Sequence, residues 1–451
     1  MQVGECMKST TTTPHPPLVP TRATLGGSIR DRWSWCESTV WTDRMLTALE
    51  SGVKGGKWYS LMDKVYAMAN LRAGFARVKA NNGGPGVDHV TIEQFESRLD
   101  EELRCLHESL RDGTYRPQAI RRGWIDKPGS TEKRPLGIPT VRDRVVQTAL
   151  RNVLEPIFEQ GFAEHSYGFR PQRSAKDALR RVAALLRQGY RVVVDADLKS
   201  YFDSILQDRL MDRVRDHVSD GRVLSLLEAF LSQPIMEGLK SYTAPNGTPQ
   251  GAVISPLLSN IYLDSLDHLM ASHGYEMTRY ADDFVLQCRT QAEAEQALAL
   301  VQAWAQAWGL TLHPDKTRIV DVRQNGFEFL GYRFFQGRRW PRTKSRQKLK
   351  DTLRRTTRRA NGHSLSTIIT RVNRTLRGWY NYFKHVQPYV FQDVDSWVRM
   401  RLRSILRKRM GLRGRGRGRD HQRWPNAFFA ERGLFSLCAA YASEHRPSSS
   451  R

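Results

Sequence analysis

The sequence predicts an α+β protein, in which helices and short strands are mixed along the chain. Apolar residues recur at helical spacing over residues 142–158 and 175–186, so that each segment carries one apolar face. The period then changes. Residues 191–197 form a β-branched run that ends in acid, and residues 277–288 and 327–334 alternate as strands do. Helical and strand patterns that follow each other in this way indicate one mixed fold.

Composition limits the class of protein before any motif is considered. The 451 residues suffice for about three domains, and 40% of them are hydrophobic, enough for a sizeable core. The 71 lysines and arginines outnumber 46 acids, and the net charge of +25 favours a polyanionic partner. The chain has no uninterrupted stretch of about 18 apolar residues, the length needed to span a bilayer. Nucleic acid is therefore favoured over a membrane as the partner. Five scattered cysteines predict neither a disulfide framework nor a cysteine zinc site, and a cytoplasmic location is expected.

The first 57 residues are predicted to be a flexible leader. Residues 1–30 are rich in threonine and proline, a composition that cannot build a packed core. Three glycines then interrupt the chain shortly before Trp58. A compact region is therefore expected to begin at residue 58 and to continue through mixed helical segments to about residue 190.

Two clusters of carboxylates stand out in so basic a chain. Asp195 and Asp197 end the predicted strand at 191–197, and Asp282 and Asp283 lie in a turn between two strands. Adjacent carboxylates repel unless a cation neutralises them, and Mg²⁺ prefers hard oxygen ligands. Two such ions, about 3.5–4 Å apart, can activate a 3′-hydroxyl and stabilise a leaving pyrophosphate. An Asp-Asp pair is also common in ordinary solvated turns, so the pair alone leaves that interpretation open.

Most of the positive charge is concentrated in one segment. Residues 338–419 contain 25 lysines and arginines and only three acids. Within this segment an apolar stripe at helical spacing runs from Leu365 to Phe383, which predicts a folded basic domain. Residues 411–419 form an Arg-Gly run with no strand before it and no Lys-Ser/Thr after it. That run is interpreted as an electrostatic arm and not as a phosphate-binding loop.

An ordered series of motifs resembles the bacterial group II intron-encoded reverse transcriptase, or maturase, family. The YADD segment at 280–283 matches the YxDD box of reverse transcriptases. The other matching segments, in chain order, are NNGGPGVD (81–88), KRPLGIPTVRDR (133–144), SYGFRP (166–171), DLKSYFD (197–203), GTPQGAVISPLLSN (247–260), LHPDKT (312–317), FLGY (329–332) and RGWYNYF (377–383). The resemblance covers about residues 58–435. The ordered set is specific, whereas any single block would not be.

The resemblance implies a right-hand polymerase and assigns its parts. The expected regions are fingers (58–190), a palm with an antiparallel sheet and the YADD site (191–336), a helical basic thumb or maturase domain X (337–410), and an Arg-Gly-rich, nucleic-acid-binding tail (411–451). It also implies that Asp197, Asp282 and Asp283 bind two catalytic Mg²⁺ ions, with Asp197 bridging both. Asp195 and Asp203 fall outside the matched acid position and are expected to be supporting or structural.

The family's nucleotide-binding positions match Lys127, Arg134, Phe202, Gln250, Gly251 and Lys316. The two fingers cations would clamp the triphosphate and neutralise charge on the leaving group. The phenylalanine ring would clash with a ribose 2′-hydroxyl and so favour dNTPs. The Gln-Gly pair lies on a turn that can approach the nascent base pair, and Lys316 could hold a phosphate. Ordinary surface basics and a core phenylalanine remain the alternative interpretations.

The basic thumb is expected to follow an RNA backbone without reading its sequence. Its candidate RNA-binding residues are Arg371, Arg374, Arg377, Arg399, Arg401 and Arg403. Tyr380 and Tyr382 could stack on bases, whereas Trp379 continues the apolar stripe and is expected in the core. Only a lone Cys438 and a lone His445 follow the thumb. The nuclease domain of many relatives, built on Cys and His pairs, is therefore expected to be absent.

Three functions remain open. The first is an RNA-directed DNA polymerase that also assists group II intron splicing and mobility, with intron RNA as template, a DNA target or primer, and dNTPs as partners. The second is an RNA-binding splicing factor with little polymerase activity, and the three intact aspartates argue against it as the sole role. The third is a related reverse transcriptase recruited to a host defence task, which the thumb motif disfavours. The long helical segments could support a homodimer.

Overall fold

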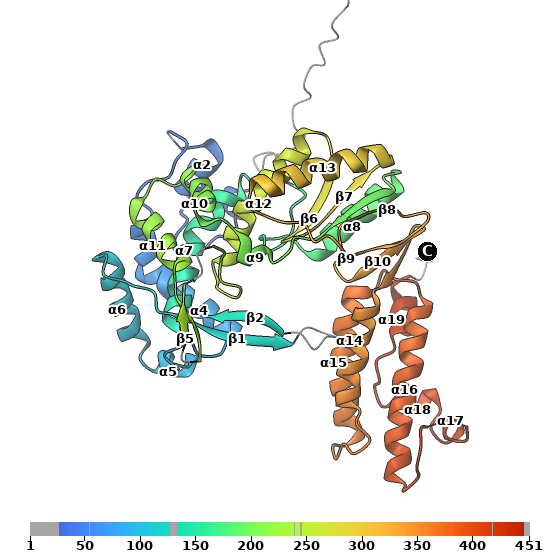
Figure 1. The fold of residues 1–451 in the computed structure, drawn as a ribbon. Helices are drawn as coiled ribbons and strands as arrows, with labels where there is room; N and C mark the ends of the chain where they lie inside the picture. The colour runs from blue at the N-terminus through green and yellow to red at the C-terminus, as the bar shows by residue number, and fades with distance from the viewer. Residues whose placement is uncertain are drawn as a thin grey trace, which may run out of the picture.

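The computed structural model describes residues 27–53, 55–126, 133–238, 240–243, 246–416 and 418–445. They form a helical region with a small sheet, a central sheet covered by helices, and a helical region beneath that sheet (Figure 1). Lys127 lies outside the described residues. Within the described residues, no helix combines the length and the apolar character needed to cross a bilayer.

The first region, on the left of Figure 1, corresponds to the predicted fingers. Its helices are α1 (Ile29–Arg32), α2 (Asp43–Ser51), α3 (Met62–Tyr66), α4 (Met68–Asn81), α5 (Ile92–Ser97), α6 (Leu99–Arg111) and α7 (Val141–Glu159). They pack around α7, which is buried along almost its whole length. A sheet of order β2-β1-β4-β5 adjoins them; its strands are β1 (Ile120–Asp126), β2 (Lys133–Ile138), β4 (Ile235–Glu237) and β5 (Lys240–Tyr242).

Part of the predicted leader folds into this first region. Trp33, Trp41 and Leu46 are completely buried in its core. The Trp41 indole nitrogen also donates a hydrogen bond to the Asn152 carbonyl oxygen of α7 at 2.9 Å. The prediction of a flexible leader is therefore wrong for residues 27–53. Residues 1–26, with most of the threonine and proline, lie outside the described residues.

The central region is built on an antiparallel sheet of order β6-β7-β3-β8. Its strands are β3 (Val192–Ala196), β6 (Glu276–Tyr280), β7 (Asp283–Cys288) and β8 (Arg318–Asp321). The helices of this part of the chain are α8 (Ala175–Arg187), α9 (Tyr201–Ser204), α10 (Gln207–Arg215), α11 (Gly221–Leu231), α12 (Ser255–Ser272) and α13 (Gln291–Ala307). Each predicted strand and helix in 175–308 is present with ends that differ by only one or two residues.

Burial on both faces of the sheet explains why the β3 sequence is a continuous apolar run. Val192 and Val194 belong to one hydrophobic core, which includes residues of α12 and α13. Val193 belongs to a second core, shared with α8 and the last helices of the chain. A strand covered on both sides needs apolar side chains at every position, and not at alternate positions.

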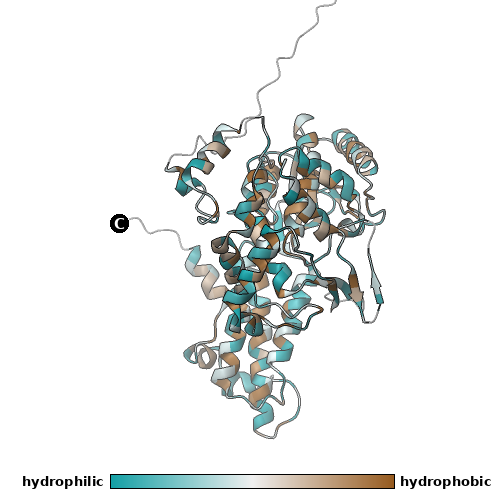
Figure 2. Ribbon diagram, turned by 90° about the vertical axis from the view of Figure 1, so that its left-hand side faces the viewer, coloured by the Kyte–Doolittle hydropathy of each residue, from teal (hydrophilic) through white to brown (hydrophobic). Residues whose placement is uncertain are grey.

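A third sheet, of order β11-β10-β9, lies at the start of the predicted thumb and is formed by β9 (Phe327–Phe329), β10 (Tyr332–Phe335) and β11 (Arg338–Pro341). The helices of the predicted thumb are α14 (Thr343–Thr356), α15 (Leu365–Phe383) and α16 (Tyr389–Arg409), and the predicted tail contains α17 (Asp420–Arg423), α18 (Asn426–Glu431) and α19 (Leu437–Glu444). The predicted apolar stripe is confirmed, because Ile368, Val372 and Leu376 of α15 are completely buried. Figure 2 shows hydrophobic and hydrophilic residues interleaved along these helices, as expected for helices with one buried face.

The predicted C-terminal tail is largely folded. Trp424, Phe429 and Leu437 are buried in the thumb core. The Asp395 carboxylate of α16 accepts hydrogen bonds from the Leu437 and Cys438 backbone amides and from the Ser436 hydroxyl, at 2.7–3.2 Å. Residues 418–445 of the predicted tail are therefore folded onto the thumb core, and the expected binding of nucleic acid by the tail stays a prediction.

Two elements pack against a different region from the one in which the predicted boundaries placed them. Helix α8, expected in the fingers, packs on the palm strands β6 and β7. The β4–β5 hairpin, expected in the palm, extends the fingers sheet through parallel pairing of β4 with β1. Residues 175–187 therefore belong in space to the palm, and residues 235–242 to the fingers, although their order in the chain suggested the reverse.

Candidate active site and nucleic-acid interface

The register of the central sheet brings the predicted catalytic acids to one end. Strands β3 and β7 pair from Val192 with Cys288 to Ala196 with Phe284. Asp197 is the next residue after that last pair, and Asp283 is the first residue of β7. Acids that are 86 positions apart in the chain therefore lie at the same edge of the sheet.

The turn that carries Asp282 and Asp283 has an unusual backbone. Ala281 adopts a left-handed conformation, with φ of 59°. Gly168 packs directly against this turn, and a Cβ atom at Gly168 would lie 2.1 Å from the Ala281 nitrogen and 2.7 Å from the Tyr280 carbonyl carbon. Only glycine fits this position without movement of the turn.

A buried polar network holds the same turn from below. The Arg279 guanidinium, with no exposed surface, donates hydrogen bonds to the Ala281 carbonyl oxygen at 2.9 Å and to the Asn260 side-chain oxygen at 3.0 Å. It also forms a buried ion pair with Asp267. The Asn260 amide nitrogen in turn donates to the Gly168 carbonyl oxygen at 2.9 Å. Residues from α12, β6 and the Gly168 loop thus fix the backbone that presents the two acids.

The sequence interpretation did not single out this network. Its signal is only partly present in the sequence: Asn260 and Asp267 lie among apolar residues of the predicted helix, whereas Arg279 lies in a strand that also contains Glu276 and Thr278. Polar residues at positions where the pattern requires burial need partners. Their pairing with one another, and not with solvent, is what the sequence alone could not specify.

The acids repel each other at this edge. Loss of hydration raises the pKa of Asp283 to about 7, and the carboxylates of Asp282, Asp195 and Asp197 act in the same direction, although part of Asp283 stays open to solvent. Loss of hydration also raises the pKa of Asp282, while the positive charge of Arg134 opposes that rise. A fingers residue therefore acts electrostatically on a palm acid.

Cations from β8 and the loop before it already contact two of these carboxylates. The Lys316 ammonium donates to the Asp197 carboxylate at 2.5 Å, and the Arg318 guanidinium lies 3.2 Å from that of Asp195. Among the described residues, no three Asp, Glu, His or Cys side chains are arranged so that they could hold a metal ion. The donors are nevertheless carboxylate oxygens in mutual repulsion, which is the chemistry that suits Mg²⁺. The carboxylate donors are therefore suited to Mg²⁺. In this structure the Asp197 carboxylate is neutralised by the Lys316 ammonium.

Three of the predicted nucleotide-binding residues, Phe202, Gln250 and Gly251, lie on segments whose backbones are linked to one another or to β2. The Phe202 carbonyl oxygen accepts a hydrogen bond from the Thr248 amide at 2.7 Å, which joins α9 to the loop before Gln250. The Gln250 carbonyl oxygen accepts from the Gly137 amide of β2 at 2.6 Å. Gly251, with φ of 109°, packs so closely on the Gly137 carbonyl that a Cβ atom would lie 2.5 Å from it. This loop therefore links the palm to the fingers strand that carries Arg134.

Four of the predicted RNA-binding arginines point outward. Arg371, Arg374 and Arg377 are exposed on one side of α15, opposite its buried stripe. The Arg377 guanidinium lies 5.4 Å from the Phe435 ring centroid. Arg399 of α16 is partly exposed and makes one hydrogen bond, at 3.3 Å, to the Ser396 hydroxyl.

Arg401 and Arg403 have structural partners instead. Arg401 donates to the Thr357 hydroxyl and carbonyl oxygens at 2.7 and 2.8 Å and stays partly exposed. Arg403 is 2% exposed and donates to the Trp424 carbonyl oxygen at 2.9 Å and to the Asn426 side-chain oxygen at 2.8 Å. The prediction that Arg403 binds RNA is corrected, because its side chain instead anchors the segment that leads into α18.

The predicted stacking residues are also largely internal. Tyr380 is 2% exposed, and the partly buried Tyr382 donates its hydroxyl hydrogen to the Leu330 carbonyl oxygen at 2.8 Å. Trp379 packs against the same core, as expected from its place in the apolar stripe. Base stacking by the two tyrosines is therefore not supported by their burial.

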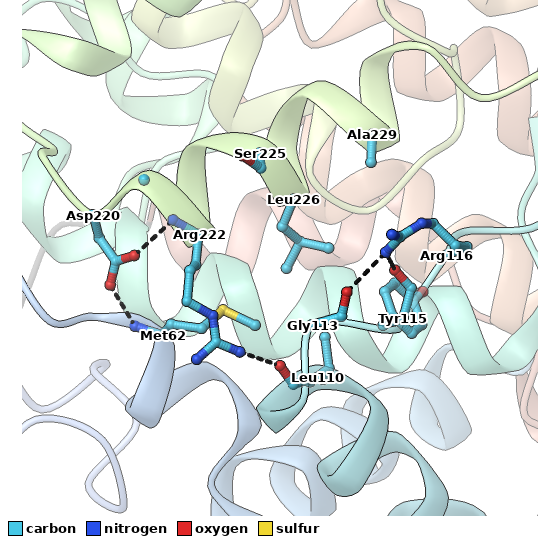
Figure 3. Close-up of a pocket in the computed structure, with 11 residues that line it drawn as sticks. Met62, Leu110, Gly113, Tyr115, Arg116, Asp220, Arg222, Ser225, Leu226 and Ala229 are labelled. Carbon is cyan, nitrogen blue, oxygen red and sulfur yellow. Dashed lines mark hydrogen bonds between the residues drawn. The ribbon is translucent and has the colours of Figure 1, made fainter.

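A cavity of about 730 Å³ lies between α6 and α11 and is lined by none of the candidate catalytic acids (Figure 3). Its two arginines are engaged with backbone oxygens: Arg222 donates to the Leu110 carbonyl and Arg116 to the Gly113 carbonyl. Asp220 caps the start of α11 and accepts from the Met62 amide at 2.9 Å. These polar groups already have partners, so the cavity adds no catalytic chemistry.

Together, the antiparallel palm sheet, the acids at one edge and the adjoining fingers strand define a reverse transcriptase. Residues 125–334 match the family described as reverse transcriptase (RNA-dependent DNA polymerase), and residues 346–424 match the group II intron, maturase-specific domain. The chain belongs to the group II intron type of reverse transcriptase. Both domains imply RNA binding.

Curated relatives cover the chain to different extents. Protein YkfC of Escherichia coli (strain K12) is 35% identical over 308 residues, which are 58% of this chain and 80% of that protein. The group II intron-encoded protein LtrA of Lactococcus lactis subsp. cremoris is 38% identical over 42% of this chain and 31% of its own length. An uncharacterized 91 kDa protein in the cob intron of Schizosaccharomyces pombe is 30% identical over 50% of this chain and 35% of its own. The chain thus spans only about a third of the two intron proteins.

Proposed function

We propose that this protein is an RNA-directed DNA polymerase that copies RNA into DNA from dNTPs, and that it also assists group II intron splicing and mobility. One observation carries the proposal: the β3–β7 register brings Asp197 and Asp283 to one edge, where Arg134 of the fingers acts on Asp282. Asp197, Asp282 and Asp283 would hold two Mg²⁺ ions. Bound Mg²⁺ supplies charge stabilisation at the attacking 3′-oxygen and at the leaving pyrophosphate.

The chain's own residues would bind and orient the nucleotide. Arg134, together with Lys127 seven residues earlier in the sequence, would neutralise triphosphate charge. Phe202 would lie under the sugar and exclude a 2′-hydroxyl, and Gln250 would contact the nucleotide from its turn. The links between the Phe202 loop, the Gln250 loop and β2 support this assignment, since they tie the three elements to one place.

Lys316 would exchange its partner during the reaction. It neutralises Asp197 in the structure. A cation at Asp197 would compete with the lysine ammonium, since both need the same carboxylate oxygens. The released ammonium would then be available to a phosphate of the primer or of the nucleotide, which is the role that the resemblance gave it.

The maturase role would fall to the exposed thumb face. Arg371, Arg374 and Arg377 lie on one side of α15, where they could contact successive phosphates of intron RNA. Such contacts position the protein without reading sequence, so binding should weaken as salt rises. The DNA target or primer would be a second polyanionic partner of the basic protein.

The polymerase proposal is tested by primer extension on an RNA template with dNTPs and Mg²⁺. Asp282→Asn should lower the rate by at least about 10³-fold, because it removes charge stabilisation of the transition state. Asp208→Asn is the matched control, since Asp208 is exposed on α10, away from the turn. Extension by Asp282→Asn at the wild-type rate would overturn the assignment.

A splicing factor without polymerase activity is the second candidate, favoured by the exposed arginines of α15 and the maturase-specific domain. It is distinguished by assaying both activities with the same preparation. Intron splicing without incorporation of any dNTP, with Mg²⁺ or Mn²⁺, would support this candidate over the polymerase. Splicing retained by Asp282→Asn together with loss of extension would support a protein with both functions.

A further inference from the structure

A basic pocket of about 490 Å³ lies on the palm, outside the site described above. It is formed where the end of α8, the end of β8 and the β10–β11 turn meet. Four arginines line it, Arg187, Arg191, Arg323 and Arg339, and its apolar part includes Leu186 and Val322. We call this cavity the palm pocket.

The charges of the palm pocket are poorly compensated. Within the part of the chain that the structure describes, the guanidinium groups of Arg187, Arg191 and Arg339 make no hydrogen bond and no ion pair. A fourth lining arginine, Arg323, is neutralised by Asp321 at 2.6 Å. No acid is among the lining residues, although Asp321, paired with Val192, lies near Arg191, whose positive charge helps to lower the Asp321 pKa. The pocket therefore presents Arg187, Arg191 and Arg339 without a direct anionic contact from any described residue.

Arg339 is the most enclosed of these three arginines, since Arg187 and Arg191 are exposed. It is partly buried, and loss of hydration lowers its pKa, with the positive charge of Arg187 acting in the same direction. A desolvated guanidinium normally has an anionic or carbonyl partner. An anion between Arg187 and Arg339 would supply that partner and relieve their repulsion.

The palm pocket lies at the opposite end of β3 from the acids. Arg191 immediately precedes β3, whereas Asp197 immediately follows it. A five-residue strand is about 16 Å long, so the two sites cannot contact the same nucleotide. A ligand of the palm pocket is thus not the incoming dNTP at the acids.

We propose that the palm pocket binds one nucleotide of an RNA strand outside the catalytic cleft, with its phosphate between the arginines and its sugar or base against the apolar part. This rests on the proposed RNA-dependent function. Planar guanidinium forks match phosphate oxygens, and the volume suits one nucleotide. A strand that passes here would be held to the back of the palm while another part is copied.

The test compares two charge-reversal pairs in the full chain. Arg187→Glu/Arg191→Glu alters exposed positions of the palm pocket, and Arg44→Glu/Arg104→Glu makes the same change in charge at exposed positions of α2 and α6. Affinity for a labelled, unstructured oligoribonucleotide is measured by filter binding from 50 to 200 mM salt. Thermal melting checks that each variant is folded, and primer extension at saturating template is recorded separately.

The palm pocket pair should bind RNA at least about 10-fold more weakly than the control pair. Its log-log salt slope should fall by about 0.7, the value for one single-strand phosphate contact. RNA carrying 4-thiouridine should crosslink wild-type protein at peptides that contain residues 186–191 or 334–339. Equal affinity of the two pairs, or crosslinks only elsewhere, would overturn the proposal.

Two further results distinguish this proposal from the polymerase proposal and from binding of a free small anion. Loss of RNA affinity in the palm pocket pair, with unchanged extension at saturating template, supports RNA binding at the palm pocket. If no protein extends primers, wild type included, only the polymerase proposal is refuted. Calorimetry with AMP and with inorganic phosphate tests a free small anion as the ligand. Saturable AMP binding that the palm pocket pair abolishes, with RNA affinity unchanged, would refute RNA as the occupant.

Discussion

Substitution of Gly168 by alanine should displace the turn that carries the two adjacent aspartates. A Cβ atom at this position would lie 2.1 Å from the Ala281 nitrogen, and real Cβ atoms essentially never approach a heavy atom within 3.0 Å. The two backbone segments must therefore separate by at least 0.9 Å, which is 3.0 − 2.1. The obstacle is backbone, which cannot rotate away as a flexible side chain would.

The expected loss follows from the size of that movement. A displacement of about 1 Å at reacting groups lowers rates by about 10²-fold, equivalent to about 2.7 kcal/mol of activation free energy. Overpacking by one methyl group should also lower the free energy of unfolding by about 1–3 kcal/mol. The protein should therefore remain folded while the turn is misplaced.

Single-turnover primer extension at saturating dNTP is the appropriate assay, with thermal melting to confirm folding. Gly221→Ala is the matched control, since a Cβ atom there meets nothing within 4 Å. It should extend primers at the wild-type rate. A folded Gly168→Ala protein within about threefold of wild type would refute the argument that this contact sets the position of Asp282 and Asp283.

Three further predictions follow from other contacts. Arg279→Met leaves Asp267 buried without its partner and should lower the free energy of unfolding by about 3–5 kcal/mol in urea titrations; a loss below 1 kcal/mol would contradict the role of this pair. Arg403→Ala should lower the melting temperature but leave RNA affinity and its salt slope unchanged, and a reduced slope would restore Arg403 as an RNA ligand. The hydrogen bond to Asp264 raises the pKa of His268 to about 9. The stability that protonated His268 contributes is therefore complete below its unfolded pKa of 6.5 and is lost as pH rises through about 9. His268→Ala should remove this pH-dependent stability between pH 6.5 and 9, and an unchanged dependence of stability on pH would contradict the prediction.

Elements whose pattern is local could be predicted from the sequence. The helix expected over 142–158 is α7, Val141–Glu159, and the strands expected around the YADD turn are β6 and β7. Their apolar periods are complete within one element, so no knowledge of the partner was needed. The acids were found in the same way, because they follow directly after such strands.

Elements stabilised by distant partners could not be predicted. The Trp41 side chain is fixed by Asn152, and the segment after α16 is fixed by Asp395 and Arg403. The composition near both ends of the chain predicted flexibility. Residues 1–30 are rich in threonine and proline, and residues 411–419 are an Arg-Gly run. Which buried surface receives Trp41 or Phe429 is a tertiary fact that no local period contains.

The contacts between side chains at the site likewise could not be predicted from the sequence. The sequence indicated that Lys316 could hold a phosphate, but not that its ammonium contacts Asp197. Helix α16 carries arginines on more than one side, and only the folded C-terminal segment determines that Arg403 is covered. Charge alone therefore located the basic region of the chain, but it could not distinguish arginines that are exposed from arginines that are covered.

The most direct test of the central claim is the single-turnover extension rate of Asp197→Asn, of Asp283→Asn and of the protein that carries both substitutions. If the two carboxylates serve one site, each single variant should be at least about 10³-fold slower than wild type, and the double variant should be no slower than the slower single variant. Rate losses that multiply in the double variant, or wild-type extension by either single variant, would contradict a shared catalytic site.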